Sequence, residues 1–372
     1  MAKETVKTNS DFLFVYEGKK TNPNGDPDME NKPRMDYDTK TNLVSDLRIK
    51  RNIREYLKDS GKKIFVDTLA DRKVTTDTML NHIVEEVTGS QEKLDKVFAK
   101  NDALKELWNS LIQHLGDDQK NYAGLRKVFK SKKAKNKGND IKSIRKQFPN
   151  LNNLLLREIV KENLIDIRMF GGAFAVEGFS STYTGPIQLN WGYSLHPVEL
   201  IKSNTIVTIM NEDASTMGKD YRLYYSLIAF HGTINKHFAA KTGLSQTNVR
   251  LFRKALVNSV AYKPTRSKGD QYPMLYLELE YLDEYNGYLR DLRDFIACSW
   301  PKNQPIRSIE SLTLDFSKLE NLINENKDII KHVHLWKTPL SGTSFDGFGN
   351  ALDEDVKSKM KELSFKPGSD EE

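Results

Sequence analysis

The residues of this chain best suited to chemistry are amide and carboxylate side chains gathered in one short loop. Asn22, Asn24 and Gly25 stand in the run Asn-Pro-Asn-Gly-Asp-Pro, in which Asp26 is the fifth residue. Two X-Pro pairs and one Asn-Gly pair predict a compact turn in which Asn24 or Gly25 takes a positive φ. Such a turn exposes backbone N–H groups and side-chain amides that suit a phosphate or a sugar. A plain connector between two elements is the alternative interpretation.

The carboxylates of the same region do not form a convincing metal site. An EF-hand calcium loop starting at Asn22 would need Gly and Glu at its sixth and twelfth positions, where Pro27 and Pro33 stand. A two-metal nuclease would need carboxylates that converge from a rigid scaffold. The four candidates share one proline-broken loop: Asp26, Asp28, Asp36 and Asp38. We therefore expect no metal and no cofactor, with a nuclease as the open alternative.

The seven histidines are scattered along the chain. His231 and His237 could serve a metal-independent ribonuclease, because imidazole acts as acid or base near neutral pH. No serine or cysteine nucleophile accompanies either one, so a core or surface histidine is the favoured interpretation.

Positive charge is concentrated in one segment. The chain carries a net charge of +6, but residues 120–146 alone hold eleven Lys/Arg against one acid, which leaves the remainder net negative. Such a run predicts a loop that binds a polyanion, with a solvated linker as the alternative. The lysines at its centre are candidate contacts with a DNA or RNA backbone: Lys130, Lys132, Lys133, Lys135 and Lys137.

Composition limits the class of protein. A chain of 372 residues with 38% hydrophobic residues and a mean hydropathy of −0.61 can bury one large core or two ordinary ones. Cys298 is the single cysteine, which excludes an internal disulfide and a cysteine-based zinc cluster. No apolar run approaches the ~20 residues of a membrane span, and the N-terminus has no signal-peptide pattern. The expected compartment is the cytoplasm.

The elements around the loop follow from hydrophobic periodicity. The unbroken apolar run 12–16 predicts a buried strand. Ser45 is a candidate cap for a helix that continues to Leu57 and carries Lys50, Arg51 and Arg54.

Further strands are predicted at 165–177, 187–195, 205–210, 222–228 and 275–281, and a helix at 245–260. The segments 205–210 and 222–228 are expected to form a β-hairpin with a long tip at 211–220. The core order strand, helix, strand, strand, helix, strand is that of the ferredoxin-like split βαβ unit. Residues from about 75 to 161 interrupt it as a helical insertion.

Several of these segments together resemble the Cas seven family, the backbone subunits of CRISPR-associated Cascade complexes, nearest to the type I-B and I-C branches. The similarity begins in the 22–36 loop and the first helix. It extends to Phe170-Gly171-Gly172-Ala173, Thr184-Gly185-Pro186-Ile187-Gln188, Thr216-Met217-Gly218-Lys219, His231-Gly232 and Lys241-Thr242-Gly243-Leu244-Ser245.

The resemblance implies an α+β fold shaped as a hand, with an RRM- or ferredoxin-like palm, helical fingers and a β-hairpin thumb. The implied bounds are 11–74, 162–202 and 223–335 for the palm, 75–161 for the Lys-rich fingers, 203–222 for the thumb, and 336–372 for a C-terminal segment with an acidic tail.

The resemblance also implies a non-catalytic subunit of antiviral defence. Several copies would oligomerise along the spacer of one CRISPR RNA and present it for pairing with target DNA. Further implied partners are a Cas five-like subunit, a large and a small subunit, and a helicase-nuclease or transposition partner.

The residues assigned to RNA binding lie in the loop, the first helix, the 170–172 segment and the hairpin: Asn22, Asn24, Gly25, Arg34, Ser45, Lys50, Arg51, Arg54, Phe170, Gly171, Gly172, Met217 and Lys219. Met217 is the candidate apolar wedge between stacked bases. Two alternatives stay open. One is a type III-like subunit that cuts target RNA with Asp26, and the other is an endonuclease that processes CRISPR RNA with His231.

Overall fold

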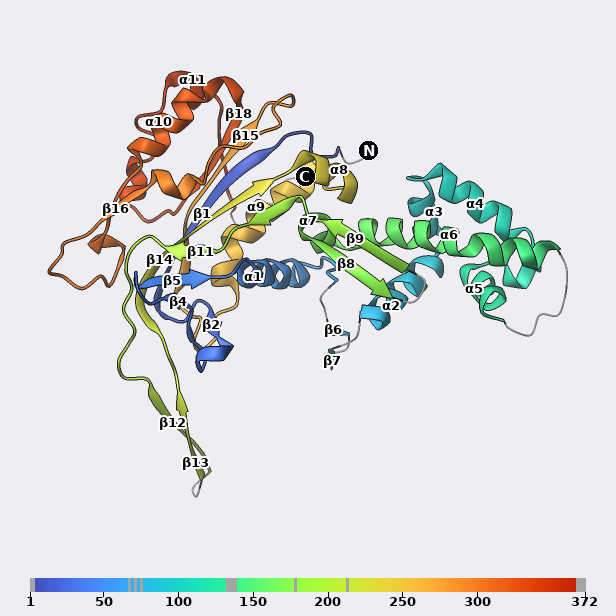
Figure 1. Cartoon of the computed structure of the whole chain (residues 1–372), viewed down its shortest axis with the longest axis horizontal. Helices are drawn as coiled ribbons and strands as arrows, with labels where there is room; N and C mark the ends of the chain where they lie inside the picture. The colour runs from blue at the N-terminus through green and yellow to red at the C-terminus, as the bar shows by residue number, and fades with distance from the viewer. Residues whose placement is uncertain are drawn as a thin grey trace. The chain divides into compact units, whose positions relative to one another are not determined.

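The computed structural model describes residues 4–65, 68–69, 72–73, 76–131, 139–176, 179–211 and 214–365. The chain forms two compact units. Unit 1 contains Met1–Ser60, Pro186–Ala240 and Leu244–Glu372, and unit 2 contains Gly61–Gly185 and Lys241–Gly243. Helices and strands occur in both units, so the chain is α+β as the sequence predicts (Figure 1). No helix in the described ranges is long and apolar enough to cross a membrane.

Unit 1 is built on one large sheet of nine strands. Its strands follow the order β19-β18-β15-β1-β14-β11-β5-β4, with β10 also pairing with β14. The β18–β19 pair is parallel, whereas the pairs that β1 and β14 make are antiparallel. The bounds are β1 (Ser10–Thr21), β4 (Met35–Asp36), β5 (Thr41–Val44), β10 (Ile187–Leu189), β11 (Gly192–Ser194), β14 (Leu223–Ile234), β15 (Gln271–Tyr281), β18 (Ile330–Lys337) and β19 (Met360–Glu362).

The other elements of unit 1 are helices and small two-stranded sheets. The helices are α1 (Asp46–Asp59), α9 (Gln246–Tyr262), α10 (Ser317–Glu325) and α11 (Glu354–Ser358), with α8 (Lys236–Thr242) ending at the unit boundary. The small sheets pair β2 (Gly25–Asp26) with β3 (Lys32–Pro33), β12 (Thr205–Asn211) with β13 (Ala214–Lys219), and β16 (Ala297–Ser299) with β17 (Thr313–Asp315). Short 3₁₀ turns include η1 (Pro27–Met29) and η3 (Leu292–Phe295).

The middle of strand β1, residues 12–16, is apolar without interruption because both faces of the sheet are covered there. Leu13 and Val15 belong to one core cluster with residues of the C-terminal third, such as Leu319. Phe12 points the other way and packs edge-on against Phe252 of α9, with ring centroids 5.4 Å apart. The buried strand predicted at 12–16 is confirmed and extended at both ends.

Helices α1 and α9 begin where the sequence predicts caps. The Ser45 hydroxyl oxygen accepts a hydrogen bond from the Arg48 N–H at 3.3 Å. Ser245 and Asn248 form a reciprocal capping box at the start of α9. A buried ion pair then ties α9 to β15, since Arg253 donates to both carboxylate oxygens of Glu278 at 2.7 and 2.8 Å.

The predicted hairpin is wrong in its second strand. Strand β12 pairs with β13, with Val207 opposite Met217, and the two project from the sheet as an arm (Figure 1). Residues 222–228 lie instead in or beside the central strand β14, which pairs with β1 from Leu223 to Ile234. Because that pairing occupies one edge of β14 over its whole length, the segment is the middle of the large sheet rather than half of a hairpin.

The strand predicted at 165–177 is also wrong in its first half. Residues Ile165–Phe170 form helix α7, and strand β8 (Gly171–Val176) follows and pairs with β9 (Phe179–Thr184) in unit 2. The switch occurs at Gly171, whose φ of +72° ends the helix. A Cβ there would lie 2.1 Å from the Tyr183 carbonyl oxygen, so the glycine allows a close backbone approach.

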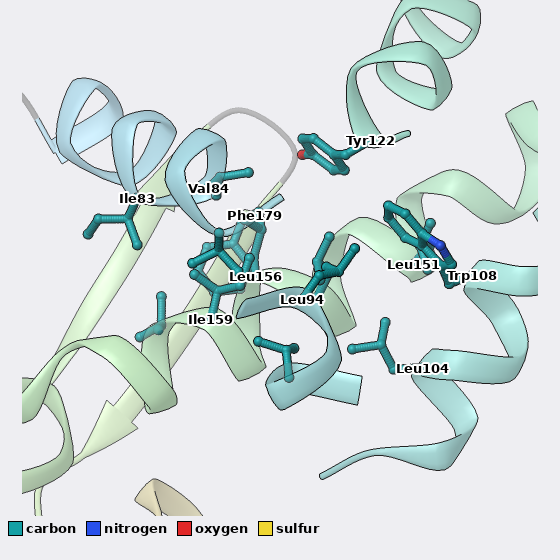
Figure 2. Packing of buried hydrophobic residues seen from close by; sticks show 14 of the residues in the cluster. Ile83, Val84, Leu94, Leu104, Trp108, Tyr122, Leu151, Leu156, Ile159 and Phe179 are labelled. Atoms are coloured by element: carbon teal, nitrogen blue, oxygen red, sulfur yellow. The ribbon is translucent and has the colours of Figure 1, made fainter. Parts of the chain in front are cut away.

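Unit 2 is a helical body around the β8–β9 hairpin. Besides α7, its elements are α2 (Thr76–Thr88), α3 (Gln91–Phe98), α4 (Asp102–Ile112), α5 (Tyr122–Lys130), α6 (Asn139–Asn163), η2 (Asp117–Gln119), β6 (Thr68–Leu69) and β7 (Arg72–Lys73). Figure 2 shows its core, where Leu94, Leu156 and Phe179 from three elements converge. The unit is wider in sequence than the insertion expected at 75–161.

Candidate nucleic-acid interface

The 22–34 loop is a small hairpin rather than a single turn. Strands β2 and β3 pair, and the 3₁₀ turn η1 connects them. The residues with positive φ are Glu30 (+53°) and Asn31 (+60°), not Asn24 or Gly25 as predicted. The reason is the position of the reversal, which falls where the Asn31 N–H donates to the Asp26 carbonyl at 2.8 Å.

Gly25 is required by a close contact and not by its φ. A Cβ at this position would lie 1.9 Å from Oδ1 of Asn31 and 3.1 Å from the Asn31 carbonyl oxygen. The absence of a side chain therefore allows the two strands of the loop to approach each other.

The two asparagine side chains point into the protein and not toward solvent. Asn22 is 1% exposed, and its amide donates to the Asn31 carbonyl at 2.7 Å. Asn24 is 8% exposed, and its Oδ1 accepts hydrogen bonds from the Ser45 N–H at 3.1 Å and the Ser45 hydroxyl at 2.9 Å. The prediction that these amides are exposed is wrong, because the Asn22 amide bonds within the loop and the Asn24 side chain attaches the loop to the start of α1.

The cations predicted to bind RNA on α1 differ in how exposed they are to solvent. Lys50 is 8% exposed and its ammonium lies 2.9 Å from the Asp46 carboxylate one turn earlier. Arg51 is half-exposed and pairs with Glu55 at 2.6 Å, while Arg54 is only partly buried. Lys50 is thus largely covered, whereas Arg51 and Arg54 are more exposed.

Arg34 lies at the edge of the loop beside an aromatic ring that sequence reasoning missed. Its guanidinium is 3.4 Å from the Asp26 carboxylate and 5.9 Å from the centre of the Trp191 ring. Trp191 is 48% exposed, which is unusual for so large an apolar side chain. Together they offer a cation and a flat stacking face.

The base of the β12–β13 arm approaches the same loop. Lys219, the last residue of β13, donates to the Glu30 carboxylate at 3.3 Å, and the Tyr221 hydroxyl donates to it at 2.8 Å. The Lys32 ammonium lies 5.2 Å from the centre of the Tyr221 ring. Lys219 therefore lies beside the loop. Met217 lies within strand β13 and not at a tip, and its side chain is outside the described residues.

A second cationic group was missed entirely. The Ser267 carbonyl accepts from the Asn22 N–H at 2.7 Å, and the Lys268 ammonium donates to the Asn22 carbonyl at 3.2 Å. Burial, and then the positive charge of Arg48, lowers the pKa of Lys268 to about 8. Burial likewise lowers the pKa of Arg48. Within the described ranges neither cation makes an ion pair with an acid. An external anion would therefore stabilise both buried charges.

A signal for this group was present in the sequence. The run Lys263-Pro264-Thr265-Arg266-Ser267-Lys268-Gly269 places three cations in one Pro/Gly turn between α9 and β15. What the sequence could not supply is the pairing of this turn with Asn22, which lies more than two hundred residues earlier.

The 170–172 segment belongs to unit 2. Phe170 is 9% exposed at the end of α7, so it is a core residue in this structure and not an open stacking surface. Gly171 and Gly172 pair with Thr184 and Tyr183 in the β8–β9 hairpin.

The Lys-rich run is only partly described. Lys130 is exposed as the last residue of α5. Lys132, Lys133, Lys135 and Lys137 lie outside the described residues.

The two candidate catalysts of the alternative interpretations have structural partners. Asp26 accepts from the Asp28 N–H at 3.2 Å as the cap of η1, besides its contact with Arg34. His231 is 5% exposed, with its Nε2 3.4 Å from the Asp11 carboxylate and its Nδ1 accepting from the Leu292 N–H. The described residues contain no group of three or more His, Cys, Asp or Glu placed to hold a metal.

Comparison with known proteins identifies the family. A family model described as CRISPR-associated protein Cas7 matches residues 8–317, which include the loop, α1, the β12–β13 arm and the 263–269 turn. The chain belongs to this Cas7 family. The resemblance to the Cas seven family is confirmed.

Individual relatives of this Cas7 chain are distant. A curated CRISPR-associated protein Cas7 of Haloferax volcanii is 24% identical over 357 residues, covering 89% of this chain and 87% of the relative. A solved chain described as "CRISPR RNA-guided surveillance complex, pre-nicking" has a TM-score of 0.46 at 14% identity and covers 91% of this chain and 95% of its own. Another, described as "CRISPR RNA-guided surveillance complex", has a TM-score of 0.43 at 11% identity and covers 96% of each chain.

Replacing Asn24 by alanine should destabilise unit 1. The substitution removes the acceptor of two Ser45 hydrogen bonds in a nearly buried position, and we expect the free energy of unfolding to fall by about 1–3 kcal/mol. Urea denaturation followed by circular dichroism measures it. The matched control is Asn303→Ala at an exposed loop position, which should change stability by less than about 0.5 kcal/mol. Equal effects of the two substitutions would contradict the assigned role of Asn24.

Proposed function

We propose that this Cas7 chain is a non-catalytic backbone subunit of a CRISPR RNA-guided surveillance complex, in which several copies bind one guide RNA side by side. The observation that carries the proposal is the gathering of cationic groups from four distant segments on unit 1: the 22–34 loop, the first turns of α1, the base of the β12–β13 arm and the 263–269 turn. The family assignment supports the same role.

The chemistry of this surface suits ribose-phosphate more than bases. Arg48, Lys219 and Lys268 offer charges to phosphates, which carry no sequence information. Trp191 and Arg34 add a stacking face that accepts any base. A subunit that must hold guides of every sequence needs this kind of contact. The guide would then remain free to pair with target DNA.

The proposed anatomy follows from the strand order. The central strands β15-β1-β14-β11, joined through α1 and α9, have the order of a split βαβ unit and would form the palm. Unit 2 would be the fingers, and the β12–β13 arm would be the thumb that parts the bases of the guide. Other subunits of the complex would cap the row of copies, and a nuclease or transposition partner would act on the target.

The partners of Asp26 and His231 support the absence of catalysis. Asp26 caps η1 and contacts Arg34, both through Oδ1, so one of its two carboxylate oxygens already has structural partners. His231 is buried and both of its ring nitrogens have neighbours, so an RNA phosphate would have to displace part of the core to reach it.

Incubation with complementary RNA tests catalysis directly. The guide-loaded protein, given a complementary RNA and magnesium, should leave that RNA intact over hours, and it should leave an unprocessed guide precursor uncut. The Asp26→Ala variant should behave like the wild type. Cleavage at regular positions that Asp26→Ala abolishes would instead establish the type III-like alternative.

The pH dependence of RNA binding tests the role of Lys268. With a pKa of about 8 in the free protein, Lys268 must take up a proton to meet a phosphate at higher pH. The affinity should therefore fall as the pH rises from 8 to 10, by up to about tenfold per pH unit. Fluorescence anisotropy with a labelled single-stranded RNA measures it. Lys268→Arg keeps its charge throughout and should lose this dependence, and identical profiles would contradict the assignment.

A further inference from the structure

The anion-binding groups at the base of the β12–β13 arm already hold a carboxylate. Glu30 receives hydrogen bonds from the Tyr221 hydroxyl at 2.8 Å and the Lys219 ammonium at 3.3 Å. Lys32 adds a second positive charge beside the Tyr221 ring. Two ammonium groups and one phenol hydroxyl around a single anion are the donors that a phosphodiester would use.

The backbone places Glu30 there at a conformational cost. Its φ of +53° lies in the left-handed region, and Asn31 follows with +60°. Asparagine tolerates this region, but a glutamate side chain gains nothing from it. The loop is thus shaped to carry a carboxylate to the arm.

The ion pair between Lys219 and Glu30 can break easily. The side chains of Lys219 and Glu30 are 57% and 60% exposed, and exposed ion pairs hold weakly. The neighbouring pair differs, since Asp220 is about one-seventh exposed and its carboxylate accepts two hydrogen bonds from Arg222 at 2.6 and 3.0 Å. One pair fixes the base of the arm while the other can open without unfolding it.

We propose that Glu30 occupies a phosphate site formed by Lys32, Lys219 and Tyr221, and that a phosphate of single-stranded RNA takes its place on binding. The inference rests on the proposed function and adds that the Glu30 carboxylate and an RNA phosphate compete for the same site. Before RNA arrives, the carboxylate keeps the two lysines from holding stray anions. Once RNA is bound, the arm is attached to the guide instead of to the loop, so arm position and guide occupancy are coupled.

Substitution of Glu30 tests the competition. Glu30→Gln removes the competing charge at constant size, and Glu30→Asn does so with a residue that the left-handed backbone accepts, which guards against misfolding. Both should tighten binding of a single-stranded RNA roughly two- to fivefold at low salt, the range expected for release of an exposed pair. This gain should shrink as salt is added, because salt screens the exposed ion pair through which Glu30 competes with the phosphate.

Two comparisons distinguish an effect at this site from an effect of the protein's net charge. Glu325→Gln removes an equal charge from an exposed position at the end of α10 and should leave affinity within measurement error. In a Lys219→Gln background, the gain from Glu30→Gln should largely disappear.

The outcomes are distinct. Weaker or unchanged RNA binding by both Glu30 variants, with normal folding, would overturn the competition and leave Glu30 as a structural latch. Failure of the wild type and every variant to bind RNA would overturn the proposed function together with this site.

Discussion

The interface depends on one buried amide. Oδ1 of Asn24 accepts two hydrogen bonds from Ser45, and the Ser45 hydroxyl in turn caps α1 by accepting from the Arg48 N–H. This chain of bonds fixes the 22–34 loop to the start of α1. The loop then carries Glu30 to the arm, while its first residue, Asn22, is bonded to the 263–269 turn. The start of α1, the base of the arm and the 263–269 turn are thus each bonded to the same loop.

The cations at this surface differ in whether they already have an acidic partner. Lys50 and Arg51 have acidic partners within α1, as is common on helix surfaces. Arg48 and Lys268 are partly buried, and the charge of Arg48 adds to the effect of burial on Lys268, which raises the free energy of the empty protein. A bound polyanion would lower that free energy. Arg48 and Lys268 would therefore contribute more to binding than the many cations on the outer surface.

The sequence predicted the features that depend on residues close together in the chain. The apolar run of β1, the cap Ser45 and the helix at 245–260 were predicted correctly, because burial on both faces, N-terminal capping and helical periodicity are visible in the sequence. The second strand of the hairpin was wrong because pairing partners are chosen by the whole sheet. Lys268 was missed for the same reason, and the amides of Asn22 and Asn24 were assigned outward because the sequence does not show which way a loop side chain points.

The central claim is that each copy holds one fixed length of guide RNA and that copies align along it. Native mass spectrometry of the protein with single-stranded RNAs of increasing length tests this most directly. The account predicts that the number of bound copies rises in steps of one, each step needing the same number of added nucleotides, whatever the sequence. A single bound copy at every length, or binding only to particular sequences, would contradict it.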